Sequence, residues 1–300
     1  MISSMPARYQ TLMAERLLIC TDLDRTLIAN GPQSESPGAR QHFTTLASRP
    51  EVTLAYVSGR HRALVEQAIT NYCLPLPDFV VGDVGTTIYH VGEEQDWQRQ
   101  TDWEQEIAQD WAGRTHADLK KLLQDLPDLR VQEPAKQNNY KLSYYVPQQS
   151  DCHALEVMIR YRLEAKGITA NLIWSIDEPA GVGLLDVLPA RASKYHAIES
   201  LMKHHGFSYA NTVFCGDSGN DIEVLASPIP AVLVANSQPD VRELARHLAD
   251  EMGHGEQLYI ARGDFMGMNG NYSAGILEGV AHYHPQTLPW MGFNLKVETI

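Results

Sequence analysis

Two aspartates follow an apolar run near the N-terminus of the sequence. Residues 17–20 are apolar, and Asp22 and Asp24 come just after Thr21. Such a run is typical of a strand buried on both faces of a parallel sheet, and ligands bind beyond the carboxyl ends of these strands. An Asp can be a nucleophile towards phosphorus, and clustered carboxylates bind Mg²⁺. This stretch could therefore hold both metal and nucleophile, although an acidic turn after a strand is the simpler interpretation.

A second pair of carboxylates follows a later apolar run. Residues 211–215 predict a strand, and Asp217 and Asp221 lie on the glycine-containing turn behind it. If both turns project from the same edge of one sheet, the four acids converge on a small volume. Acids packed this closely repel one another, so the cluster implies a cation. We expect Mg²⁺ to be bound by the side chains of Asp22 and Asp217 and by the backbone carbonyl of Asp24.

A hydroxyl and an ammonium group complete the set. Ser58 follows the apolar run 52–57, and Lys194 begins a predicted helix that extends to residue 204. A phosphoryl group in transfer spreads charge over its equatorial oxygens, which donors of these two kinds stabilise. Each residue is a weak signal alone, but together with the two acidic pairs they indicate phosphoryl transfer.

Alternating strand-like and helix-like segments would position these residues. Their spacing predicts right-handed βαβ units and therefore an α/β core with a Rossmann-like parallel sheet. Strands are predicted at 17–22, 52–57, 78–82, 86–89, 211–215 and 231–234, and helices at 38–48, 62–72, 194–204 and from 221 onward.

A segment of different character interrupts this pattern. Residues 92–189 combine acidic helix-like pieces with alternating strand-like pieces, which suggests an antiparallel sheet covered on one side. We therefore expect a smaller, inserted α+β cap domain at 92–189 and a core assembled from 1–91 and 190–300. The tail after Pro285 shows no clear periodicity, and its role is not predicted.

Two shorter stretches give further expectations. Residues 28–37 are rich in Gly, Pro, Asn and Ser, which predicts a flap over the mouth of the site. Within a predicted helix at 102–125, Trp103, Ile107 and Trp111 fall on one face. Such a stripe is more typical of a core than of a platform for sugar binding.

Composition narrows the class of protein. The formal net charge is −13 and no cluster of Lys and Arg is visible, which argues against a nucleic-acid binder. The four cysteines show no CxxC spacing and are interpreted as reduced thiols. No apolar run reaches transmembrane length, and residues 1–15 lack the apolar centre of a signal peptide. We therefore expect a soluble, cytoplasmic protein without membrane or nucleic-acid partners.

The order of these motifs resembles the haloacid dehalogenase-like superfamily of phosphatases. The matching residues are Asp-x-Asp-x-Thr at 22–26, Ser58 after a strand, Lys194, and Gly-Asp-x-x-x-Asp at 216–221. The resemblance extends through the whole predicted core and implies a phosphatase with an aspartyl-phosphate intermediate.

The resemblance also implies a role for each matched residue. Asp22 would be the nucleophile, and Asp24 would protonate the leaving alcohol and then activate the water that hydrolyses the phospho-aspartate. Thr26 would orient the loop that carries them. Ser58 and Lys194 would hold the phosphate, and Asp217 and Asp221 would anchor the metal.

A cap inserted between the Ser and Lys motifs resembles the subfamily that includes sugar phosphatases and phosphomannomutases. Local stretches are similar to the sucrose-6-phosphate phosphatase family, which implies Mg²⁺-dependent hydrolysis of sucrose 6-phosphate. They are residues 137–145, 184–189, 216–221, 235–239 and 273–279. The chain departs from the family at Tyr195 and His196, where glycine is usual, and at 86–89, where a Ser-Glu-Ile-Tyr type of sequence is common.

The cap is expected to select the sugar by hydrogen bonds to its hydroxyls. We predict as substrate-binding residues Asn138, Lys141 and Asp186 in the cap, with Thr87 and Asn220 at the edge of the core. For each cap residue and for Thr87, an exposed strand residue is an equally good interpretation.

Three other functions stay open at this point. The substrate could be a glucosylglycerate or mannosylglycerate phosphate, or the enzyme could be a phosphohexomutase. The third possibility is a non-catalytic partner of a sucrose-phosphate-synthesising glycosyltransferase. The complete set of catalytic residues argues against this last one, because binding alone would not require Asp24.

Overall fold

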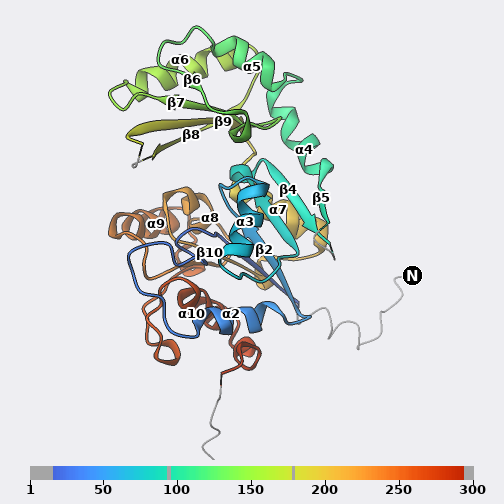
Figure 1. Cartoon of the computed structure of the whole chain (residues 1–300), viewed down its shortest axis with the longest axis vertical. Coiled ribbons are helices and arrows are strands. Elements are labelled where there is room, and N and C mark those ends of the chain that lie inside the picture. The colour runs from blue at the N-terminus through green and yellow to red at the C-terminus, as the bar shows by residue number, and fades with distance from the viewer. Residues whose placement is uncertain (1–15, 93–95, 178–179, 294–300) are drawn as a thin grey trace, which may run out of the picture.

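Two sheets organise the chain in the computed structural model, which describes residues 16–92, 96–177 and 180–293 (Figure 1). The large sheet has the strand order β12-β11-β10-β1-β2-β3-β4-β5, and the small sheet the order β6-β7-β9-β8. Neighbours from β12 to β3 run parallel, whereas β4 and β5 run antiparallel to the strands beside them. The prediction of an α/β core with a smaller α+β part is confirmed.

The large sheet and its helices form the core. Its strands are β1 (Leu17–Thr21), β2 (Val52–Val57), β3 (Phe79–Gly82), β4 (Thr87–Val91), β5 (Trp97–Arg99), β10 (Thr212–Gly216), β11 (Ala231–Leu233) and β12 (Leu258–Ile260). Its helices are α2 (Ala39–Ala47), α3 (Arg62–Asn71), α4 (Thr101–Ala108), α7 (Lys194–His205), α8 (Ile222–Leu225), α9 (Pro239–Glu251) and α10 (Ser273–Tyr283).

The small sheet and two helices form the cap, which lies at the top of Figure 1. Its strands are β6 (Arg130–Val131), β7 (Leu142–Val146), β8 (Ala170–Asp177) and β9 (Val182–Pro189), covered on the outer face by α5 (His116–Leu123) and α6 (Cys152–Glu164). None of the helices that the structure describes is long and apolar enough to cross a membrane.

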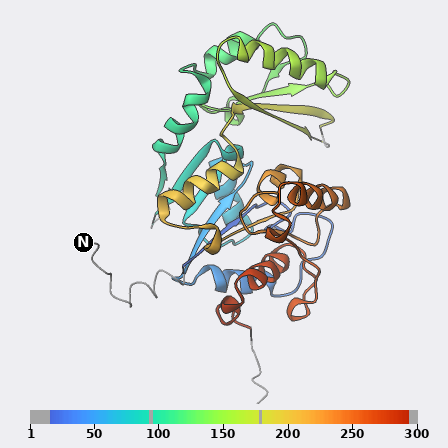
Figure 2. The same ribbon diagram turned by 180° about the vertical axis from the view of Figure 1, so that it is seen from behind.

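Strand β1 is buried on both faces, as its apolar sequence predicts. Successive side chains of a strand point to opposite faces, so Leu17 and Ile19 pack among α2, α3 and α10. Leu18 and Cys20 pack among α7, α8 and α9 on the other face. Figures 1 and 2 show these helices on the two sides of the sheet. Every residue of β1 is therefore committed to the core, and only the residues beyond its end are free for chemistry.

The order of the strands creates a crevice beside β1. The chain runs from β1 to β2 and β3 on one side, and later returns to β10 on the other side of β1. Ligands of open α/β sheets bind at such a reversal, beyond the carboxyl ends of the strands. The residues that follow β1 and β10 are therefore placed at the expected binding position.

The first described strand after the predicted start of the inserted segment at Gly92 still belongs to the large sheet. Strand β5 pairs with β4 in the large sheet, and Trp103 and Ile107 of α4 pack in the core beside α7. Trp111 packs instead in a separate cluster inside the cap. We therefore propose that the insert begins after α4. All three stripe residues are buried, as a core stripe requires.

The single helix predicted at 102–125 is wrong. The segment is divided into α4, a 3-10 turn at Gln109–Trp111, and α5. Ala112 and Gly113 have φ angles of 50° and 74°, which a right-handed helix does not allow. The apolar pattern continues across this break, so periodicity alone does not reveal it.

The predicted flap at 28–37 is fastened to the C-terminal part of the core. The side-chain amides of Asn269 and Asn271 donate to the carbonyl of Ser34 at 2.8 and 3.1 Å. The backbone N–H of Asn269 donates to Ser36 Oγ at 2.9 Å. These bonds hold the loop to the turn before α10, and its residues do not line the cavities described below.

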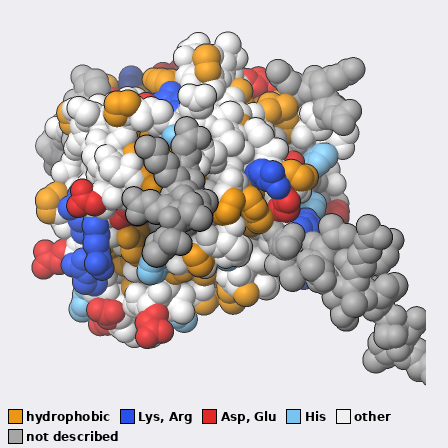
Figure 3. Space-filling model, turned by 90° about the horizontal axis from the view of Figure 1, so that it is seen from below, with side chains coloured by type: hydrophobic (Ala, Val, Ile, Leu, Met, Phe, Trp, Pro, Cys, Tyr) orange, Lys and Arg blue, Asp and Glu red, His pale blue; other side chains and the backbone are white. Residues whose placement is uncertain are grey.

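The tail after Pro285 contains a 3-10 helix at Pro285–Met291, with Met291 buried against the core. Residues 294–300 lie outside the described part. On the face of the core far from the cap, the basic side chains of the described residues lie beside acidic ones and do not form one large patch (Figure 3).

Two connections join core and cap, and one ion pair ties them together. Asp110, in the first connection, is buried. Its carboxylate accepts from the backbone N–H of Arg191, in the second connection, at 2.8 Å, and from the Arg191 guanidinium at 2.7 and 2.9 Å. Asp110 and Arg191, the hinge pair, therefore fasten the two connections to each other.

We expect Asp110→Ala to lower the free energy of unfolding by about 1–3 kcal/mol, because the donors of Arg191 lose their buried acceptor. Denaturant unfolding measures this change. Asp125→Ala is the matched control, since it removes the Arg162–Asp125 ion pair on the exposed surface of the cap. A loss in the control as large as that in Asp110→Ala would contradict the structural role of the hinge pair.

Candidate active site

The two acidic turns lie side by side at the carboxyl ends of β1 and β10. Thr21 and Cys215 are neighbours across the parallel strands, and the N–H of Asp22 donates to the carbonyl of Cys215 at 2.9 Å. Asp217 follows β10 directly. The parallel pairing therefore brings together carboxylates that are nearly two hundred residues apart in the sequence.

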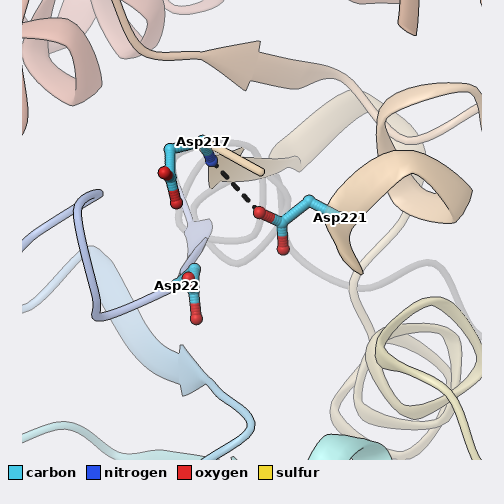
Figure 4. A group of neighbouring side chains, drawn as sticks. All are labelled: Asp22, Asp217 and Asp221. Carbon is cyan, nitrogen blue, oxygen red and sulfur yellow. Dashed lines mark hydrogen bonds between the residues drawn. The ribbon is translucent and has the colours of Figure 1, made fainter. Parts of the chain in front are cut away.

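Asp22, Asp217 and Asp221 form a buried carboxylate triad (Figure 4). Each offers an oxygen that lies within 4.8 Å of the other two. Their exposed fractions are 4%, 3% and 0%. Three converging carboxylate oxygens are a donor set that suits a hard divalent cation.

Local hydrogen bonds fix the orientation of the triad. Asp221 lies on a 3-10 turn, and its Oδ2 accepts from the backbone N–H groups of Asp217 and Ser218 at 3.1 Å each. Thr26 donates its hydroxyl to Asp217 Oδ1 at 3.2 Å, so the first turn is tied to the second. A Cβ at Gly216 would lie 2.6 Å from the Asp221 carboxyl group, so this position requires glycine.

Lys194 supplies the positive charge of the cluster. It is the first residue of α7, and its buried Nζ lies 2.7 Å from Asp221 Oδ1 and 3.2 Å from Asp22 Oδ1. Burial lowers the pKa of the ammonium, but the two carboxylates outweigh this effect and raise the pKa of Lys194 above its ordinary value.

The Lys194 ammonium and the partly exposed guanidinium of Arg25, whose Nε lies 3.5 Å from Asp217 Oδ2, do not balance three buried acids. Burial is the main cause that raises the pKa of Asp22 to about 7. The Lys194 ammonium lowers this pKa, but the negative charges of Asp221 and Asp217 raise it further. Burial and the charge of Asp221 likewise raise the pKa of Asp217 to about 6. A bound cation would relieve this repulsion, so the residues present fit a metal site.

Asp24 has a different environment from the triad. Both of its carboxylate oxygens accept from the guanidinium of Arg60, at 2.6 and 2.7 Å, and Asn30 donates to it at 2.7 Å. Burial raises the pKa of Asp24, but Arg60 and Asn30 outweigh it and lower that pKa below its ordinary value. That Asp24 also lends its carbonyl to a metal stays a prediction.

No role was predicted for Arg60 or Asn30. Arg60 stands two residues beyond Ser58, just after the end of β2. Because it follows a buried strand as the predicted residues do, its position could have identified it. Asn30 stands in a polar loop without distinctive spacing. Its contact with Asp24 depends on the tertiary course of that loop.

A cavity of about 350 Å³ opens above these residues. Asp22, Asp24, Ser58, Arg60 and Asp217 are among the residues that line it. Most of the predicted catalytic residues therefore face one open space. Lys194 lies beneath it, in contact with Asp22.

A second cavity, of about 550 Å³, connects this site to the cap. Gly59, Leu64, Ser218 and Asn220 line both cavities. Lys141, Trp174 and Asp186 line the cap side of the second one. A ligand bound to the catalytic residues could therefore extend into the cap.

The predicted substrate residues fall into two groups. The Lys141 ammonium and the Asp186 carboxylate form an ion pair, Nζ to Oδ2, at 3.6 Å in the wall of the cap cavity, and Asn220 stands where the two cavities meet. Asn138 instead donates to the hydroxyl of Thr86 at 2.8 Å, and the buried Thr87 donates to Asp83 at 3.4 Å. Neither Asn138 nor Thr87 is among the residues that line the two cavities.

The parallel core, the inserted cap and the acidic cluster define a haloacid dehalogenase-like hydrolase. The chain belongs to the sucrose-6F-phosphate phosphohydrolase family, whose sequence model matches residues 15–284. The family resemblance inferred from the motifs is therefore confirmed.

Individual relatives agree with this assignment. A solved sucrose-phosphatase from Synechocystis sp., in complex with sucrose and phosphate, has a TM-score of 0.68 and 27% identity, and covers 90% of this chain and 98% of that one. A Nitrosococcus oceani protein named only as a HAD-like hydrolase is 56% identical over 280 residues, 93% of this chain and 75% of its own length. Tobacco sucrose-phosphatase 1 is 28% identical over 288 residues, 93% of this chain. The match spans only 62% of the tobacco protein.

We expect Lys194→Met to lower the free energy of unfolding in EDTA by about 3–5 kcal/mol, because it leaves buried carboxylates without their cation. Adding Asp221→Asn should recover part of this loss, since it removes one of those carboxylates. Denaturant unfolding measures both variants. Lys203→Met, at an exposed position of the same helix, is the control, and a wild-type stability for Lys194→Met would contradict the charge balance described here.

Proposed function

We propose that this protein is a Mg²⁺-dependent phosphatase that hydrolyses sucrose 6-phosphate to sucrose and phosphate through an aspartyl-phosphate intermediate. The observation that carries the proposal is the placement of Asp22. It belongs to the carboxylate triad, its carboxylate pairs with the Lys194 ammonium, and it lines a cavity that adjoins the one reaching into the cap.

Asp22 is the proposed nucleophile. One of its carboxylate oxygens attacks phosphorus and forms a P–O bond, while the bond from phosphorus to the sugar oxygen breaks. Ser58 and Lys194 hold the phosphate oxygens during transfer. Mg²⁺, held by Asp22, Asp217 and Asp221, would supply the positive charge that offsets the combined charge of the phosphate and the acids.

Asp24 is the proposed acid and base. It gives a proton to the departing sugar oxygen, and then takes a proton from the water that attacks the phospho-aspartate and regenerates Asp22. In the structure Asp24 is bound as a carboxylate by Arg60. Its acid step therefore requires that this ion pair opens when the substrate is bound.

The cap cavity supports a sugar as the leaving group. Lys141 can donate hydrogen bonds and Asp186 can accept them, and the side chain of Trp174 offers an apolar face beside them. This combination suits a ring that carries both hydroxyls and C–H faces. The Synechocystis relative was solved in complex with sucrose and phosphate, which supports sucrose as the sugar.

One observation favours a second candidate substrate. Lys136 and His61 line the same cavity as Lys141, so it can also accommodate an anionic group. A glucosylglycerate or mannosylglycerate phosphate carries such a carboxylate. A glycosyltransferase that synthesises sucrose 6-phosphate would supply the substrate. Its binding to this protein stays a prediction.

A substrate panel tests the proposal. We expect the purified protein to release inorganic phosphate from sucrose 6-phosphate in preference to glucosylglycerate, mannosylglycerate, glucose and fructose phosphates. Release should stop in EDTA and return with Mg²⁺, because the triad needs its cation. Equal, weak release from every ester would overturn the assigned substrate, and an isomerised sugar phosphate without free phosphate would indicate a phosphohexomutase.

Two variants serve as controls in the same assay. Asp22→Asn should abolish phosphate release and leave the protein folded, because asparagine retains the shape but not the nucleophilic carboxylate. Asp102→Asn, at an exposed position on α4, should behave like the wild type.

A further inference from the structure

The side chain of Asn236 joins the turn at residues 22–26, the catalytic turn, to the C-terminal part of the core. Asn236 lies shortly after β11 and is 2% exposed. Its Nδ2 donates to the carbonyl of Arg25 at 2.6 Å, and its Oδ1 accepts from the backbone N–H of Tyr272 at 2.8 Å. A carbonyl can only accept and an N–H can only donate, so these partners fix the orientation of the amide.

Both of its partners have unusual backbone conformations. Arg25 and Tyr272 have φ angles of 59° and 51°, a strained left-handed conformation that persists at non-glycine residues only where the surroundings impose it. Arg25 stands between Asp24 and Thr26. The bond from Asn236 therefore holds a strained peptide in the middle of the acidic motif.

The peptide on the other side of Arg25, which joins it to Asp24, is held as well. The N–H of Arg25 donates to Asn30 Oδ1 at 2.9 Å, and Asn30 in turn donates to Asp24. The N–H of Ala235 donates to the carbonyl of Gly270 at 2.9 Å, so the segment before α10 supports the strand end that carries Asn236. In addition to the bond between Thr26 and Asp217, the buried amide of Asn236 thus connects the C-terminal part of the core to the catalytic turn.

We propose that Asn236 is a positioning residue that fixes the Arg25 turn, and through it the place of Asp24 relative to the leaving oxygen of the substrate. This inference rests on the proposed phosphatase activity. Asn236 is not among the residues that line either cavity. Its loss should therefore affect the chemical step and leave substrate binding unchanged.

The choice of leaving group gives a specific readout. A sugar alkoxide needs a proton from Asp24 in order to depart, whereas p-nitrophenolate departs without one. Hydrolysis of the phospho-aspartate is common to both esters, so the comparison uses kcat/KM, which reports the first step. A displaced turn should lower kcat/KM more for the sugar phosphate than for p-nitrophenyl phosphate. General loss of folded protein would reduce both activities by the same factor.

Two substitutions separate the two hydrogen bonds. Asn236→Asp retains an acceptor for the N–H of Tyr272 but has no donor for the carbonyl of Arg25. Asn236→Ala loses both. Ser237→Ala is the matched control, because this buried neighbour accepts from Arg242 and does not contact the catalytic turn.

The experiment compares steady-state kinetics of these proteins on sucrose 6-phosphate, or on the best ester of the wild type, and on p-nitrophenyl phosphate. We expect both Asn236 variants to lower kcat for the sugar phosphate by ~100-fold with KM unchanged, since small misplacements of a catalytic group have effects of this order. Ser237→Ala should keep wild-type kinetics.

Several outcomes would overturn the inference. They are an unchanged kcat in Asn236→Asp, an effect confined to KM, or an equal loss of kcat/KM on both esters. The wild type is measured first in every series. Its failure on all phosphate esters would count against the proposed function, whereas wild-type activity with unaffected Asn236 variants would count against the positioning role alone.

Discussion

The buried ammonium group of Lys194 forms ion pairs with two buried carboxylates, and the folding of the core depends on this contact. Lys194 reaches Asp22 after β1 and Asp221 beyond β10, so three segments distant in sequence must meet for the charges to be compensated. An unpaired charge at this depth would be strongly destabilising. The site is therefore a structural element of the fold as well as a place for chemistry, and its surplus of negative charge is suited to a metal cation.

The catalytic turn depends on support from outside itself. Arg25 adopts a left-handed conformation between Asp24 and Thr26, and its carbonyl and N–H are held by different side chains. Such strain persists only when the surroundings impose it. The cap lies on the opposite side of the site. Its residue Lys141 lines the same cavity as Asn220 of the core. The acidic cluster and the cap residues thus lie in different parts of the chain, and two adjoining cavities connect them.

Much of the core was predictable because buried parallel strands have continuous apolar sequences and end at a common edge. For this reason the structure brings Asp22, Asp217 and Asp221 together, as their strand-end positions indicated. The ion pair of Asp24 with Arg60 and the bonds of Asn236 depend on side-chain directions that no periodicity records. The start of the cap at residue 92 stays a prediction, and β5, which pairs with β4 in the large sheet, has only three residues, too few to show alternation. Thr87 and Asn138 were predicted, together with Lys141 and Asp186, as partners of sugar hydroxyls, and in the structure their side chains donate to Asp83 and Thr86.

Trapping the phosphorylated residue tests most directly whether Asp22 is the nucleophile. The protein would be quenched at several times during the first turnovers of its sugar phosphate and treated with borohydride, which reduces an aspartyl-phosphate to homoserine. Peptide mass spectrometry should then find homoserine at position 22 of the wild type, and none in Asp22→Asn. Homoserine at another aspartate, or release of phosphate with position 22 unmodified at every quench time, would contradict the assignment.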